Sequence, residues 1–233
     1  MILAAGIGSR LKELTTDTPK ALIKIKDKTL LEIVVDKLKS QGVEDIIINV
    51  HHFAQQIIEF ASGKNNFGIN LEFSHEGELL DTGGGLKKAS WFFENEEVFL
   101  LHNVDVLSNI DIQDLQQYHK DNEASVSIAV RSRKTTRYFL FDKNNQLCGW
   151  KNENTGEEKI SKTTDEQLSP FSFMGIHIIS PKIFKYFPKE EKFSIVDYYL
   201  NIASNNKILG YRADKFSWID CGRPEKLIEA ENI

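Results

Sequence analysis

The chain of 233 residues carries 34 acidic and 29 basic side chains, a formal net charge of −5, and 41% hydrophobic residues. This length suits one large α/β domain or two small ones, and the acidic balance argues against a nucleic-acid partner. No apolar run approaches the ~20 residues that span a bilayer, and no signal peptide precedes the first expected strand. Cys148 and Cys221 lie far apart without a C-x-x-C spacing, so we expect a reducing, cytoplasmic location and neither a disulfide framework nor a zinc site.

The first half of the chain alternates expected strands with expected helices. Residues 45–50 form a continuous apolar run, typical of a parallel strand buried on both faces. Residues 30–39 have the apolar spacing of a helix, which Gly42 closes. The expected strands of this half are 2–4, 45–50, 69–73 and 97–101, and the expected helices are 30–39, 53–61, a segment that follows residues 82–85, and 111–120.

The pattern changes after residue 120. Strands are expected over 124–130, 138–141, 147–150 and 171–179, with a hairpin turn over 142–145, and helices over 182–187, 194–204 and 224–232. The βαβ rhythm of the first half predicts an α/β fold in which a mainly parallel central sheet is flanked by helices. The later strands predict a small antiparallel portion within the same single domain, residues 1–233.

A turn of small residues follows the first expected strand. Gly6 and Gly8 are followed by the hydroxyl group of Ser9 and the guanidinium group of Arg10. Such a turn exposes backbone N–H groups that can wrap a phosphate chain. Lys20 adds a second cation, so we expect a polyphosphate site here. The alternative is a tight turn followed by a basic surface loop, because short glycine motifs often match by chance.

A second segment lies at a strand-to-helix junction, where Asp81 and Thr82 precede the glycine triplet 83–85. A helix that begins with a Thr cap and glycines offers open backbone donors and acceptors, which can read a flat base. A flexible turn is the alternative for a glycine triplet taken alone.

Two aspartates end buried strands of the predicted sheet. Asp105 follows Asn103 at the end of one expected strand, and Asp220 ends a late strand before the last expected helix. Open α/β sheets bind ligands at the carboxyl ends of their strands, and Mg²⁺ prefers one or two carboxylates with phosphate oxygens and waters. The alternative is that each aspartate only caps the helix that follows it.

Other polar residues are expected to have structural or surface roles. The basic run over residues 131–134 is expected to be a solvated turn. The histidines lack the spacing of metal ligands, although His102 lies beside the site and can shift the pKa of a neighbour. This group comprises His51, His52, His75, His102 and His177.

In order and spacing, these segments resemble the sugar-1-phosphate nucleotidyltransferases. The resemblance runs essentially end to end and is carried by residues 4–11, 19–22, 81–85, 103–105 and 218–222. Within that family the chain is most similar to the single-domain N-acetylmuramate-1-phosphate uridylyltransferases, and the mannose-1-phosphate guanylyltransferases are related enzymes that use another base. The resemblance implies a Rossmann-like nucleotidyltransferase fold, with a nucleotide-binding half over about 1–120 and a sugar-phosphate-binding half over about 121–233.

The resemblance also implies a reaction, in which a nucleoside triphosphate and a sugar-1-phosphate give a nucleotide-sugar and pyrophosphate. UTP with N-acetylmuramate-1-phosphate is the expected pair. The resemblance assigns charge neutralisation in catalysis to Arg10 and Lys20, and the binding of a shared Mg²⁺ cofactor to Asp105 and Asp220. The nucleotide-binding residues that it implies are Leu3, Ala4, Ala5, Gly6, Gly8, Ser9, Asp81, Thr82 and Gly83, and the sugar-phosphate-binding residues are Asn103 and Gly175.

The chain departs from this family in one segment that matters. It lacks the Glu-Lys-Pro segment whose lysine meets the sugar phosphate, and Lys151, Lys159 and Lys162 are the candidates for that role. Relatives begin two or three residues earlier, which leaves open whether Met1 is the native start. The base, the sugar and the oligomeric state also stay open.

Alternatives in function are a guanylyltransferase acting on mannose-1-phosphate or a related hexose or heptose, and a non-catalytic regulatory homologue. Retention of the four charged residues argues against the regulatory homologue. A nicotinamide oxidoreductase fits less well, because Leu11 replaces the third glycine of its fingerprint. A phosphocholine cytidylyltransferase shares the opening loop but not the glycine triplet or the Asp220 segment.

Overall fold

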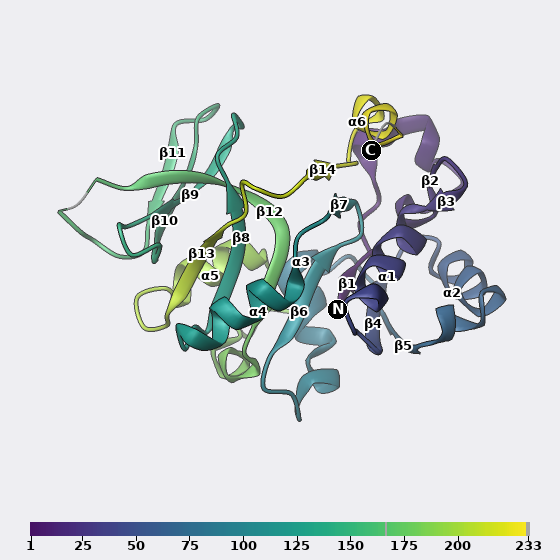
Figure 1. Cartoon of the computed structure of the whole chain (residues 1–233), viewed down its shortest axis with the longest axis horizontal. Helices are drawn as coiled ribbons and strands as arrows, with labels where there is room; N and C mark the ends of the chain where they lie inside the picture. The colour runs from purple at the N-terminus through teal and green to yellow at the C-terminus, as the bar shows by residue number, and fades with distance from the viewer. Residues whose placement is uncertain (166, 232–233) are drawn as a thin grey trace.

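A computed structural model describes residues 1–165 and 167–231, and a ten-stranded sheet runs through it (Figure 1). Eight strands follow the spatial order β11-β10-β9-β12-β6-β1-β4-β5, while β8 pairs with β12 and β13 pairs with β8. The strands are β1 (Ile2–Leu3), β4 (Asp45–Val50), β5 (Asn70–His75), β6 (Phe99–Asn103), β8 (Val126–Arg131), β9 (Arg137–Phe141), β10 (Leu147–Asn152), β11 (Glu157–Ile160), β12 (Ser169–Ile179) and β13 (Ile208–Arg212).

The sheet has a parallel part and an antiparallel part. Strands β6, β1, β4 and β5 pair in parallel, whereas β12 is antiparallel to β6, β8 and β9. The long strand β12 therefore joins the two parts, and Figure 1 shows it curving from one to the other. Its register against β8 shifts between Phe173 and His177, a segment that contains Gly175 with φ +77°.

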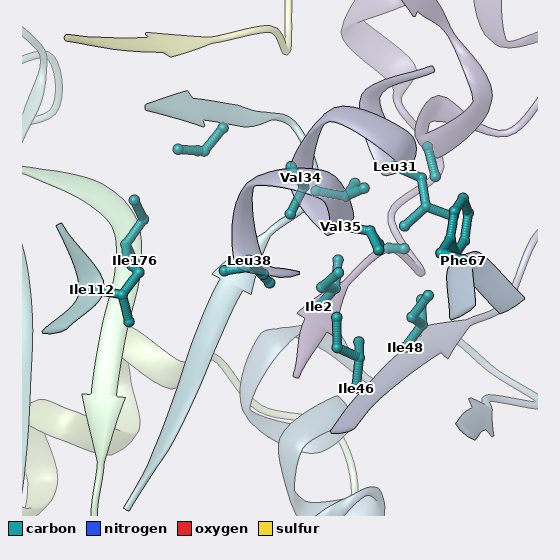
Figure 2. Close-up of a cluster of buried hydrophobic side chains, with 14 of the residues drawn as sticks. Ile2, Leu31, Val34, Val35, Leu38, Ile46, Ile48, Phe67, Ile112 and Ile176 are labelled. Carbon is teal, nitrogen blue, oxygen red and sulfur yellow. The ribbon is translucent and has the colours of Figure 1, made fainter. Parts of the chain in front are cut away.

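Helices cover both faces of the sheet because its central strands are apolar on both sides. In β4, Ile46 and Ile48 belong to one core cluster, and Ile47, which points the opposite way, belongs to another. Figure 2 shows the first cluster, in which α1 lies over β1 and β4. The α-helices are α1 (Leu30–Ser40), α2 (Ala54–Gly63), α3 (Asp81–Lys88), α4 (Ile112–Asp121), α5 (Ile195–Ile202) and α6 (Pro224–Ala230).

Helix α1 shows how local sequence sets these boundaries. Thr29 accepts a hydrogen bond from the backbone N–H of Glu32, whose carboxylate accepts one from the backbone of Thr29, so a capping box begins the helix. Short elements complete the fold. They are the 3₁₀ helices η1 (Ser9–Thr15), η2 (Lys20–Leu22), η3 (Asn65–Gly68), η4 (Ser90–Phe93) and η5 (Pro181–Tyr186), and the strands β2 (Lys24–Ile25), β3 (Lys28–Thr29), β7 (Val106–Ser108) and β14 (Trp218–Asp220).

The C-terminal helix packs against the N-terminal loop, as the yellow and purple segments at the upper right of Figure 1 show. Leu11 of η1 and Leu227 of α6 share a buried cluster with Ile219 of β14 and Cys221. This cluster fixes the loop that carries Arg10 against the strand that carries Asp220. The loop that follows β1 and the C-terminal helix thereby meet at one place.

The predicted fold class is confirmed, and the differences lie in short elements. Strands β7, β11 and β13 and the hairpin β2–β3 were not predicted, and the expected helix over 182–187 is the 3₁₀ helix η5. The predicted end of the last helix, Asn232, lies outside the described residues. In the part of the chain that the structure describes, no helix combines the length and apolar character that crossing a membrane requires.

Candidate active site

The opening loop leaves β1 with its backbone anchored from the neighbouring strand. The N–H of Ala4 donates to Oδ1 of Asn49 at 2.7 Å. Gly8 then adopts φ +65°, and a Cβ atom there would lie 2.8 Å from Cγ2 of Thr15. Only glycine fits this turn without strain, because its φ is left-handed and its space is already filled. The turn leads into η1, which carries the exposed Arg10 away from the strand.

One cavity, of about 300 Å³, opens beside this loop at the carboxyl ends of β1, β4 and β6, and we call it the first cavity. It collects predicted residues from four separate segments, as expected of a ligand site at the edge of a parallel sheet. Its lining includes the predicted residues Leu3, Ala4, Ala5, Gly6, Lys20, Asp81, Thr82, Asn103 and Asp105, together with Asn49, Glu76 and Lys192. Gly8 and Ser9 do not line it.

A buried polar network holds one wall of the first cavity. Glu76 is 1% exposed, and its Oε1 accepts a hydrogen bond from Nδ2 of Asn49 at 2.7 Å. Its Oε2 accepts one from the N–H of Leu80 at 3.0 Å. Since Asn49 also holds the N–H of Ala4, the carboxylate of Glu76 connects the opening loop to the start of α3. Neither Asn49 nor Glu76 is among the site residues predicted from the sequence.

The glycine triplet has a packing role that differs from the predicted one. The N–H groups of Gly83 and Gly84 both donate to the carbonyl oxygen of Phe193, at 3.0 and 3.2 Å. A Cβ atom on either glycine would overlap the segment 191–193, which crosses the start of the helix. The prediction that these two N–H groups are open to a base is therefore wrong, because a segment from the second half of the chain occupies them. Thr82 is not the helix cap either, since its Oγ1 accepts from the N–H of Ile195.

The two predicted metal-binding aspartates come together through a pair of short strands. β14 pairs with β7 in antiparallel fashion, with Asp220 opposite Val106, and the N–H of Cys221 donates to the carbonyl oxygen of Asp105 at 2.8 Å. Oδ2 of Asp105 is bound by Nζ of Lys20, and both side chains are nearly buried, with 13% and 11% exposed. Hence the structure brings three of the four predicted charged residues into one place.

Arg10 completes this group. A Cβ atom on Gly222 would lie 2.5 Å from Nη2 of Arg10 and 2.7 Å from Oδ1 of Asp220, so the glycine leaves room for both side chains. Among the described residues no group of three or more His, Cys, Asp or Glu side chains is arranged to hold a metal ion. The two carboxylates still match what Mg²⁺ requires, because this ion takes most of its remaining ligands from phosphates and water.

Another cavity, of about 1030 Å³, also borders this group, and we call it the second cavity. Arg10 and Asp220 line it, together with the loop 131–137 and Trp218. The prediction of a solvated turn is wrong for its first residue, because Arg131 is half-buried at the end of β8. The guanidinium of Arg133 lies 4.7 Å from the centre of the Trp218 ring, and burial lowers its pKa while Asp220 opposes this shift.

Gly175 and the three candidate lysines are placed differently from the prediction. A Cβ atom on Gly175 would lie 2.9 Å from Nδ2 of Asn103, so this glycine makes room for a protein side chain, and it lines neither cavity. Lys151, Lys159 and Lys162 lie on or beside the hairpin β10–β11, outside the lining of both cavities. Lys151 pairs with Glu153, and Lys159 pairs with Asp197 and Glu157.

Buried titratable groups near the site are held neutral. Burial lowers the pKa of His102 to about 4, and its Nδ1 lies 2.8 Å from the carbonyl oxygen of Asn103. Burial, together with Asp105 and Asp220, raises the pKa of the Cys221 thiol to about 12. Neither group is poised for proton transfer or nucleophilic attack near neutral pH. The chemistry of the site therefore rests on its lysine, its arginines and its aspartates.

Comparisons with known proteins agree with this geometry. The whole chain, residues 1–233, matches the protein family described as nucleotidyl transferase. It is 32% identical over 231 residues to the D-glycero-alpha-D-manno-heptose 1-phosphate guanylyltransferase of Campylobacter jejuni, covering 97% of this chain and 95% of the relative. It is 27% identical to the N-acetylmuramate alpha-1-phosphate uridylyltransferase of Caulobacter vibrioides, covering 99% and 94%.

A solved structure gives the same result for the fold. The crystal structure of HddC from Yersinia pseudotuberculosis complexed with GMP-PN superimposes with a TM-score of 0.79 at 25% identity, covering 99% of this chain and 96% of that one.

Proposed function

Because the chain belongs to the nucleotidyl transferase family, we propose that it joins a nucleoside triphosphate to a sugar-1-phosphate and releases pyrophosphate. The observation that carries this proposal is that Lys20 and Asp105 line one cavity while Arg10 and Asp220 line another. A hydrogen bond from the N–H of Cys221 to the carbonyl oxygen of Asp105 joins the two pairs. One cavity holds the nucleotide beside the opening loop, and the other receives the second substrate. Two anionic substrates need cations and a metal site where they meet, and this is where the four charged residues lie.

The reaction is a substitution at the α-phosphorus. A phosphate oxygen of the sugar-1-phosphate forms a bond to the α-phosphorus while the bond from that phosphorus to the β-phosphate oxygen breaks. Such transfers depend on alignment and charge neutralisation, and they need no covalent nucleophile. This requirement fits a site whose only nearby thiol, among the described residues, is buried with a raised pKa.

Each charged residue has a role in this scheme. Lys20 neutralises the α-phosphate, and Arg10 stabilises the leaving pyrophosphate. Asp105 and Asp220 are the residues that would hold Mg²⁺, which, when bound, offsets the charge of the phosphates of both substrates. In the absence of substrates, the ion pair between Lys20 and Asp105 keeps both buried charges compensated, as nearly buried ions require.

Two substrate pairs are favoured by the comparisons, and they differ in the base. GTP with a heptose- or mannose-type 1-phosphate is supported by the 32% identical relative and by the structure that contains GMP-PN. UTP with N-acetylmuramate-1-phosphate is supported by the 27% identical relative. We propose both as the first candidates, because the relatives that support them differ in the base.

The test is a matrix of the four nucleoside triphosphates against mannose-1-phosphate, a heptose-1-phosphate, glucose-1-phosphate and N-acetylmuramate-1-phosphate. Pyrophosphate release with Mg²⁺ is measured in every combination. Turnover that depends on both substrates supports the proposal, and the preferred pair identifies the base and the sugar. If no pair releases pyrophosphate while nucleotide still binds, the chain is a regulatory homologue instead.

A further inference from the structure

The second cavity is strongly cationic in a chain whose net charge is negative. Its described lining contains seven Lys or Arg side chains and three acidic ones, whereas the whole chain carries a formal charge of −5. Two of the acidic residues are neutralised locally, because Glu225 pairs with Arg223 and Glu229 pairs with Lys226. The remaining positive charge therefore gathers on the loop that follows β8, opposite Asp220.

Two arginines of this loop share one aromatic platform. The guanidinium carbons of Arg131 and Arg133 lie 5.9 and 4.7 Å from the ring centre of Trp218. The ring itself is fixed, because its Nε1 donates to the carbonyl oxygen of Met174 at 2.8 Å. Since Trp218 stands two residues before Asp220, both guanidinium groups are held beside the predicted metal site.

The guanidinium groups have donors to spare. Nε of Arg131 is buried and has no hydrogen-bond partner among the residues that the structure describes. Neither Arg131 nor Arg133 forms an ion pair within that part of the chain. A buried, unsatisfied charged donor is costly unless an anion completes it. Guanidinium groups bind phosphate oxygens through paired N–H donors, so two of them suit a phosphate group.

The loop is held in place rather than free. The N–H of Ser132 donates to Oδ1 of Asp214 at 2.7 Å, and the N–H of Thr135 donates to the hydroxyl oxygen of Tyr138 at 2.8 Å. The backbone that carries the arginines is thus preorganised, which lowers the entropic cost of binding a ligand.

We propose that Arg131 and Arg133 form the binding site for the phosphate group of the sugar-1-phosphate. This inference rests on the proposed function and gives the second substrate a place. It also explains how the chain works without the Glu-Lys-Pro lysine: Lys151 and Lys159 are paired with acidic residues outside both cavities. Asp220 lines the same cavity, so a phosphate held on the two arginines lies near the predicted metal site.

The test is a calorimetric titration of the full chain with mannose-1-phosphate, inorganic phosphate, pyrophosphate and GTP. The variants are Arg131→Gln, Arg133→Gln and their combination, and the control is Lys215→Gln. Lys215 also lies over an aromatic ring, that of Phe216, but outside both cavities, so its substitution removes the same charge elsewhere. Thermal unfolding of each variant establishes that the fold is retained.

We expect each single substitution to weaken mannose-1-phosphate and inorganic phosphate at least tenfold, equivalent to about 1.4 kcal/mol. The affinity for GTP should change less than twofold. Arg133→Lys should restore part of the loss, because it keeps the charge but not the fork. Where a sugar-1-phosphate supports turnover, its KM should rise while the KM of the nucleotide stays constant.

Three results would overturn the inference: wild-type protein that binds neither phosphate compound, a double variant that binds them like wild type, or a loss confined to pyrophosphate. The last result would assign the arginines to the leaving group. If the variants lose phosphate binding but wild type never turns over, the binding site stands and the proposed activity fails. The two proposals are therefore separable.

Discussion

The buried carboxylate of Glu76 holds the wall of the first cavity, and Glu76→Gln tests that role. In the unsubstituted chain the N–H of Leu80 donates to Oε2 of Glu76 at 3.0 Å. Glutamine keeps an oxygen for the Nδ2 of Asn49 but turns an NH₂ group toward that N–H, so the hydrogen bond is lost. A hydrogen bond to a charged acceptor contributes about 1.5–3 kcal/mol, so we expect the free energy of unfolding to fall by about 2–3 kcal/mol. For a chain of this size that corresponds to a Tm lower by about 4–12 °C.

The assay is thermal unfolding monitored by circular dichroism, with the KM of the nucleotide measured in parallel. The KM should rise several-fold, because Glu76 holds Asn49, which in turn holds the N–H of Ala4 in the phosphate loop. Glu78→Gln is the matched control, since Glu78 is an exposed glutamate two residues away. A Glu76→Gln protein whose Tm lies within 1 °C of wild type would refute the reasoning, because the network would then contribute nothing.

Two further predictions concern stability. Burial lowers the pKa of His177 to about 3, whereas in the unfolded chain it is about 6.5. At a pH below about 6.5 the unfolded state therefore binds more protons than the folded state. Lowering the pH from 7 to 5 should reduce the free energy of unfolding by about 2 kcal/mol. His177→Gln should flatten the dependence of Tm on pH, whereas His52→Gln, at an exposed histidine, should leave it unchanged. Equal slopes of Tm against pH for His177→Gln and wild type would contradict this role of His177. Gly84→Ala places a methyl group onto the carbonyl oxygen of Glu191 and should destabilise the chain by about 1–3 kcal/mol in chemical denaturation. Gly77→Ala is the control, because a Cβ atom there meets nothing within 4 Å. Equal denaturation midpoints for the two variants would contradict this prediction, because the segment 191–193 would then move aside with no loss of stability.

Local patterns were sufficient for the parallel half of the fold. The apolar run at residues 45–50 is strand β4, and the helical spacing after Thr29 is α1. Periodicity determines such elements because each buries a face that the sequence displays directly. The position of Asn49 in the sequence indicates a buried polar contact that was not predicted. Asn49 is the only polar residue between Ile46 and Val50, and a buried polar group needs a partner, which is Glu76 directly after the next strand.

Non-local pairings were beyond prediction from local patterns. Strands β7 and β14 have three residues each and form only because residues far apart in the sequence meet. The partner of the glycine triplet, Phe193, comes more than a hundred residues later in the chain. The same holds for the contacts of Arg131 and Arg133 with the ring of Trp218, which stands more than eighty residues later in the chain. Contacts of this kind depend on topology, which the spacing of apolar residues does not encode.

The most direct test of the central claim is the rate of Mg²⁺-dependent pyrophosphate release by Asp105→Asn and Asp220→Asn, assayed with the preferred substrate pair. Asp105 lines the first cavity and Asp220 lines the second, and the N–H of Cys221 joins the two segments by donating to the carbonyl oxygen of Asp105. Each substitution should therefore lower turnover at least a hundredfold, equivalent to about 2.7 kcal/mol of activation free energy, while the fold is retained. Asp36→Asn, at an exposed aspartate, is the control and should turn over at the wild-type rate. Full turnover by either the Asp105 or the Asp220 variant would contradict a reaction centred on this acidic pair.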